Sequence, residues 1–177
     1  MVVVEFQPSS WSRGSYLNVG CMWLWNIRQH LSFDVGYRVN GFSPFENGQQ
    51  FGLAADKLTA GALEKVREYR RVFRSIHDVS NYYFENVPKS FWPCFDAAIA
   101  HSLAGRAEAS TQILAACLDG SNDDPPWLTE ARLDARTLAV SVGDVYRMRD
   151  IISDRVMQNR AQQHLPPITK INFDVSS

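Results

Sequence analysis

The sequence predicts a single α+β domain over residues 1–177, in which an antiparallel meander of at least three strands is followed by and packed against about five helices. Two patterns predict this class. Apolar and polar residues alternate through residues 1–42, whereas apolar residues recur at spacings of three and four through residues 50–165. Strands that precede helices are typical of an antiparallel sheet with helices on one side. Residues 166–177 are expected to form a tail, either as an edge strand or loose.

Three strands are predicted within the first part of the chain. Residues 2–7 alternate as a half-buried strand does, and turn residues follow them. Residues 16–25 are apolar on both faces, which predicts a central strand that is covered on both sides. Residues 31–39 alternate strictly, so one face is expected in the core and the other, with Asp34 and Arg38, in solvent. The predicted core face of this third strand carries Leu31, Phe33, Val35, Tyr37 and Val39.

The helical part of the chain is divided by proline and glycine. A stripe of apolar residues from Leu58 to Ile76 predicts one long helix that lies across the sheet. Later helices are expected to begin near prolines and to end at glycine, because proline suits a first helical turn and glycine a C-terminus. They are predicted at residues 92–103, 107–118, 127–142 and 145–163, with a loop at 120–126 and a break at Gly143 and Asp144.

Composition indicates a cytoplasmic protein without a nucleic acid or membrane partner. The 18 basic and 19 acidic residues give a net charge of −1, which provides no field to hold a nucleic acid backbone. No stretch approaches the roughly 18 apolar residues of a membrane span, and the N-terminus lacks the features of a signal peptide. Cys21, Cys94 and Cys117 show no paired spacing, so reduced thiols are expected rather than a disulfide framework or a zinc site.

No residue pattern predicts catalysis, a metal or a cofactor. The serines lack a nucleophile-elbow context, and the glycines form neither a dinucleotide nor a phosphate-binding fingerprint. Metal ligands on helices usually lie three or four residues apart, and no two histidines have this spacing. The four histidines are His30, His77, His101 and His164.

The segments VVVEFQPSSW, YLNVGCMWLW and LSFDVGYRV resemble the bacterial family catalogued only as domain of unknown function 4304. In that family a strand that ends in a Gln-Ser type segment is followed by a strand with an Asn-Val/Leu-Gly core. Members usually begin with a helix and a strand before the equivalent of Val2, so the resemblance leaves open whether the native chain starts upstream of Met1. It covers about the first third of the chain and implies a binding role of the toxin-neutralising kind, with no catalytic residues.

Four residues are predicted to contact a partner, which is expected to be another protein. Trp11 lies in the first turn, and Trp25 ends the second strand, where an indole is often half exposed. Asp34 and Arg38 share a polar face about 13 Å apart at the rise of a strand, so each needs a cross-strand partner or a ligand. The leading hypothesis is therefore a non-catalytic interaction module. Two alternatives stay open: a ligand pocket or enzyme site between sheet and helices that uses Asp34, Arg38 and His30, and a homo-oligomeric scaffold.

Overall fold

The computed structural model describes residues 1–28, 30–119 and 124–173. Contacts divide the chain into two compact units, of which the first comprises Met1–Leu24 and Arg28–Val72. The second comprises Trp25–Ile27 and Phe73–Ser177. Two such units can form within one domain, so the single domain over residues 1–177 stays a prediction. The α+β class itself is confirmed, with an antiparallel sheet and six helices in the described residues.

The first unit contains the sheet. Its strands are β1 (Val2–Pro8), β2 (Gly14–Cys21), β3 (Val35–Arg38) and the short β4 (Ser43–Pro44). The order is β1-β2-β3, every pairing is antiparallel, and β4 also pairs with β2. The predicted meander and its central strand are therefore confirmed, and β2 is buried along most of its length because it has neighbours on both edges.

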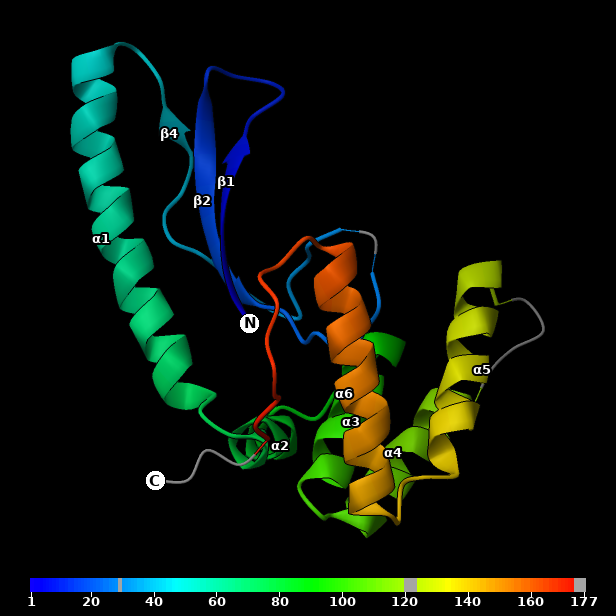
Figure 1. Ribbon diagram of the computed structural model, residues 1–177. Coiled ribbons are helices and arrows are strands. Elements are labelled where there is room, and N and C mark those ends of the chain that lie inside the picture. The colour runs from blue at the N-terminus through cyan, green and yellow to red at the C-terminus, as the bar shows by residue number, and fades with distance from the viewer. Residues whose placement is uncertain (29, 120–123, 174–177) are drawn as a thin grey trace. The chain divides into compact units, whose positions relative to one another are not determined.

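Helix α1 (Gly48–Val72) covers one face of this sheet (Figure 1). The ring of Phe51 on α1 meets that of Phe6 on β1 edge to face, with centroids 6.3 Å apart. Leu58 and Tyr69, from the predicted apolar stripe, are buried on this helix. The predicted packing of this helix on the sheet is thus confirmed.

The predicted continuation of this helix to Ile76 is wrong. Helix α1 ends at Val72, and α2 (Ile76–Glu85) begins after Ser75. Ser75 and Asp78 form a capping box, in which the Asp78 backbone N–H donates to Ser75 Oγ and the Ser75 backbone N–H donates to Asp78 Oδ2. Because these bonds satisfy groups that a new helix would leave orphaned, the chain stops and restarts here despite the continuous apolar spacing.

Strand β3 is shorter than predicted. Within it the alternation holds: Val35 and Tyr37 pair with residues on the α1 side, while Arg38 pairs with Asn18 on the other side. The expectation fails before the strand, because the Phe33 ring lies against Gly20, on the face opposite α1. The exposure of the side chains predicted to face the core also differs from the prediction. Leu31 and Tyr37 are exposed, so the third segment has no fully buried core face.

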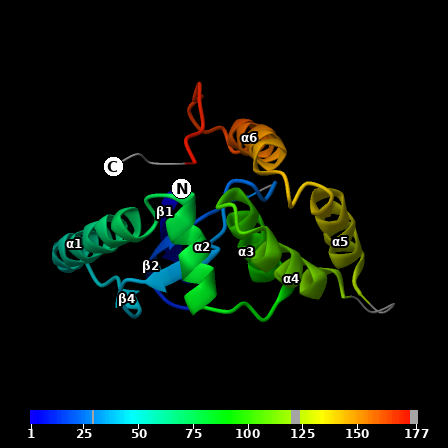
Figure 2. The same cartoon turned by 90° about the horizontal axis from the view of Figure 1, so that it is seen from below.

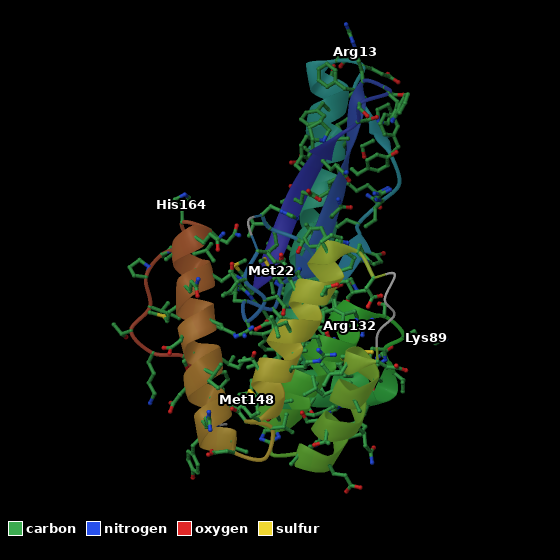
Figure 3. The ribbon with its side chains drawn as sticks, turned by 90° about the vertical axis from the view of Figure 1, so that its right-hand side faces the viewer. Arg13, Met22, Lys89, Arg132, Met148 and His164 are labelled. Carbon is green, nitrogen blue, oxygen red and sulfur yellow. The ribbon has the colours of Figure 1, made fainter. Side chains whose placement is uncertain are left out.

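The second unit is helical. Helix α3 (Phe91–Leu103) is buried from Phe95 onward, and it packs against three other helices, with α3 and α4 (Ala107–Leu118) side by side (Figure 2). Met148 and His164 lie toward opposite ends of the last helix (Figure 3). The remaining elements of this unit are α5 (Pro126–Ala139) and α6 (Val145–Gln162).

Two helices end or begin at the residues that the sequence predicted. Gly105, with φ of +76°, ends α3 in the left-handed region that favours glycine, and the Arg106 backbone N–H donates to His101 O. Asp144 caps α6, since its Oδ1 accepts from the Arg147 backbone N–H at 2.9 Å. Most of the predicted loop at residues 120–126 lies outside the described residues. The described part of the tail, residues 166–173, forms no strand.

Among the described ranges, none of the helices combines the length and apolar character required for a membrane span.

Candidate functional site

Trp11 lies in the turn between β1 and β2, near Arg13 at the tip of this hairpin (Figure 3). Its side chain is 93% exposed, more than any other large apolar side chain in the described residues. The turn itself is ordered by Ser9 Oγ, which accepts from the backbone N–H of Trp11 and of Ser12. The predicted availability of Trp11 in this loop is consistent with its exposure, and its binding role stays a prediction.

Trp25 does not have the predicted half-exposed indole. It is 6% exposed, and its Nε1–H donates to Asp96 Oδ1 on α3 at 2.8 Å. The neighbouring Asn26 donates through Nδ2 to the same oxygen at 2.6 Å. A buried carboxylate needs hydrogen-bond donors, so Asp96 holds both residues in the core of the second unit.

Asp34 fixes the loop between β2 and β3 instead of facing solvent. Its Oδ2 accepts from the Trp23 backbone N–H, and its Oδ1 accepts from Arg28 Nη2, both at 2.6 Å. The side chain is 4% exposed. Burial raises the pKa of Asp34, while the two donors act in the opposite direction. The predicted solvent face is therefore wrong for Asp34, because its carboxylate satisfies nearby donors of its own unit.

Arg38 belongs to a polar cluster on the sheet face opposite α1. Its guanidinium lies 4.1 Å from the centroid of the Tyr16 ring, and its Nε donates to Asn18 Oδ1. Asn18 in turn donates through Nδ2 to Glu5 Oε2 at 2.8 Å and Gln7 Oε1 at 3.2 Å. The cluster therefore satisfies its members by contacts across three strands. The sequence did not identify Asn18 as its centre, although an asparagine in a central apolar strand was a signal.

A cleft in the second unit was not predicted. Its volume is about 320 Å³, and we call it the indole cleft. The side chains come from the Asn26 segment and from three helices that lie far apart in sequence. Its lining consists of Asn26, Ile27, Trp92, Phe95, Asp134, Arg155 and Gln158.

The polar wall of the indole cleft is held in place by paired hydrogen bonds. Arg155 binds Asp134 with both terminal nitrogens, the Nη1 to Oδ2 distance being 2.7 Å. Asn26 is buried, its backbone O accepts from Asn159 Nδ2 at 2.6 Å, and its Oδ1 has no hydrogen-bond partner within the described ranges. Buried acceptors are normally paired, and this oxygen is one of the exceptions in the described residues.

The aromatic wall extends beyond the indole cleft. Trp92 meets Phe95 edge to face, and it also lies beside Trp127 at the start of α5. The two indoles are nearly parallel, at 13°, with centroids 6.4 Å apart. They are 37% and 53% exposed. Two tryptophans therefore present a continuous apolar surface that starts inside the cleft and ends outside it.

A serine and histidine pair elsewhere in the second unit is structural. Ser80 Oγ lies 2.6 Å from His101 Nδ1 and also accepts from Arg106 Nη1 at 2.9 Å. Burial, together with the Arg106 charge, lowers the pKa of His101 to about 4. Ser80 and His101 are fully buried and line none of the described cavities, so a substrate could not reach them.

Metal ligands are not grouped in the described part of the chain, where no three His, Cys, Asp or Glu side chains could hold one ion. Comparison of the chain with family models, with curated proteins and with solved structures gave no match. The resemblance of the first third of the chain to domain of unknown function 4304 therefore stays a prediction.

Proposed function

We propose that the protein is a non-catalytic protein-binding module whose indole cleft binds a segment of the partner. The observation that supports this proposal most strongly is the exposed pair of Trp92 and Trp127 beside a cleft with fixed polar groups. Protein interfaces are enriched in tryptophan and arginine, and their binding energy concentrates in a few such residues. Trp92 and Arg155 supply both residue types in the cleft wall.

The shape of the surface supports a polypeptide segment as occupant. The volume of about 320 Å³ is near the lower end of the roughly 300–1,000 Å³ of small-molecule pockets. The aromatic surface continues out of the cleft to Trp127, which an enclosed small molecule would leave uncovered. An extended segment would place an apolar side chain on Trp92 and Phe95 and reach Trp127.

The experiment measures affinity for a purified partner that has first been identified by cross-linking. Trp127→Ala should weaken binding by about 2 kcal/mol, or about 30-fold in Kd, because truncation of a central interface tryptophan has this effect. Tyr146→Ala is the matched control, since Tyr146 is an exposed aromatic on α6 that does not line the cleft. Equal affinity of both variants, with unchanged melting temperatures, would contradict the proposal.

The resemblance to a bacterial family suggests a protein toxin as the first partner class to test. A toxin-neutralising module should inhibit its toxin at equimolar concentration, and Trp127→Ala should require a higher concentration for the same inhibition. Trp11→Ala forms a separate arm of this assay, because the solitary Trp11 indole is the other exposed tryptophan that a partner could cover. Loss of inhibition in Trp11→Ala alone would transfer the binding surface to the hairpin of the first unit.

A small-ligand function is the second candidate. It is favoured by the fixed ion pair of Arg155 and Asp134, which lines the cleft beside the apolar side chains of Trp92 and Phe95. Such a ligand would raise the melting temperature of the wild-type chain and would not do so for Arg155→Ala. Retention of the full partner affinity in the presence of that ligand would separate the two functions.

A further inference from the structure

Two cysteines meet in a second cavity of the helical unit. Cys94 on α3 and Cys117 on α4 are near enough for each side chain to influence the ionisation of the other. Both line a cavity of about 280 Å³, which we call the dithiol pocket. Arg132 and Lys89, which carry positive charge, also line it and are labelled in Figure 3. No sequence pattern predicts this pairing, because the two residues are separated by most of two helices.

The two thiols differ in access to solvent. Cys94 is partly exposed, and its Sγ contacts Pro88 O at 3.7 Å, whereas Cys117 is buried. Arg132 donates to Cys117 O, so the end of α4 is held against α5 at this point. A small molecule in the pocket would therefore reach the sulfur of Cys94 before the buried sulfur of Cys117.

We propose that Cys94 and Cys117 form an oxidation site for peroxides, at which the two thiols are converted into one disulfide that links α3 to α4. The Cys94 thiolate attacks one peroxide oxygen, the O–O bond breaks, and the released hydroxide takes a proton to become water. Cys94 is then a sulfenic acid. The sulfur of Cys117 attacks the sulfur of Cys94, the S–O bond breaks, and the second water leaves with the Cys117 proton. Both sulfurs are oxidised and both peroxide oxygens are reduced.

The difference in burial assigns these two roles. Burial raises the pKa of both thiols, and the proximity of Cys94 raises that of Cys117 further. Cys117 is the buried thiol and therefore keeps its proton, whereas the partly exposed Cys94 can lose its proton to solvent. At Cys117, Asp96 adds to the upward shift of the pKa and Arg132 opposes it. The thiolate fraction, and with it the oxidation rate, should increase from neutral to alkaline pH.

The experiment treats the full folded chain with hydrogen peroxide and follows intact mass and free thiols. The wild-type chain and Cys21→Ser should each lose two hydrogen atoms in mass and two free thiols, and dithiothreitol should restore both. Cys21 is the matched control because it is a buried thiol of the first unit. Cys117→Ser should instead gain one oxygen atom, located at Cys94 by a sulfenic-acid probe.

Three results would overturn the site. One is a wild-type chain that stays fully reduced, or gains oxygen without forming a disulfide. The second is a peptide map that links Cys21 to either cysteine. The third is loss of two hydrogen atoms in Cys117→Ser or in Cys94→Ala. Cys94→Ala serves beside Cys94→Ser in case one of them does not fold, and far-ultraviolet circular dichroism establishes folding before peroxide is added.

Discussion

The two units use their polar side chains in different ways. In the first unit, the predicted Asp34 and Arg38 are occupied by neighbours of their own sheet and loop. In the second unit, Asn26, Asp134 and Arg155, none of which was predicted, line a cleft beside two exposed indoles. A polar side chain on a strand often forms its hydrogen bonds with the adjacent strand. Helices that cross, by contrast, leave gaps in which polar side chains stay accessible.

The largest expected effect tests whether the Asn26 segment is integral to the second unit. Asp96→Ala removes the acceptor of Trp25 Nε1 and Asn26 Nδ2. Each buried donor left without an acceptor costs about 1–3 kcal/mol, so the free energy of unfolding should fall by about 4 kcal/mol. Urea unfolding followed by tryptophan fluorescence measures it. Asp56→Ala, at an exposed position of α1, should change it by less than about 0.5 kcal/mol.

If Asp96→Ala lowers the free energy of unfolding by less than about 1 kcal/mol, the Asn26 segment contributes little to the stability of the second unit and the difference between the units is not as described.

The sheet of the first unit is tested by Gly20→Ala. A Cβ at this position would lie 2.3 Å from Phe33 Cδ1 and 2.8 Å from Val35 O. Because one neighbour is backbone, the strands must shift, and we expect a loss of about 3 kcal/mol in the free energy of unfolding. Gly52→Ala is the control with opposite sign. It has open space on α1 and should stabilise by about 0.5–1 kcal/mol. Equal behaviour of both variants would show that Phe33 does not lie against β2.

The second unit should be destabilised by acid through His101. Its folded pKa of about 4 is below the ordinary value of 6.5, so the unfolded chain binds more protons between these values and stability falls as pH decreases. From about pH 6.5 to pH 5 the loss should be about 2 kcal/mol, at about 1.4 kcal/mol for each pH unit. Denaturant unfolding at a series of pH values measures the slope. The slope should be reduced in His101→Gln, and a slope unchanged by this substitution would assign the acid sensitivity to other groups.

The smallest effect concerns Trp11. Its indole is almost fully exposed, so Trp11→Ala should change the free energy of unfolding by less than about 0.5 kcal/mol. By contrast, Trp25→Ala should cost about 3–5 kcal/mol, as for other buried aromatic residues. Thermal melting of the two variants, which differ by fourteen positions in the same part of the chain, gives the contrast directly. Similar melting temperatures of the two variants would mean that the buried Trp25 stabilises the fold no more than the exposed Trp11.

The sequence was sufficient to predict the helix bounds that are determined by one short segment. The bounds of α4 agree with those predicted, and Gly105 ends α3 because a left-handed residue is required there. The Asn18 to Gly20 run of the family resemblance also has a local meaning. Asn18 joins polar groups from both neighbouring strands, and Gly20 leaves space for the Phe33 ring.

The sequence was not sufficient for contacts between distant segments. Trp25 has the pattern of a strand end, and its burial is stabilised by Asp96, which follows 71 positions later. The indole cleft combines residues from Asn26 to Gln158, whose spacing has no period that a pattern could reveal. Prediction of this site would have required the packing angles of α3, α5 and α6.

The assignment of Trp25–Ile27 to the second unit has a consequence for synthesis and folding of the chain. The hydrogen bond from Asn159 Nδ2 to Asn26 O closes a loop of 133 positions, one of the longest-range bonds of the described residues. The wall of the indole cleft cannot be completed until Gln158 has left the ribosome. Loop-closure entropy grows slowly with length, so this delay affects the order of folding more than the final stability. A nascent chain that ends before Gln158 would therefore lack the completed cleft.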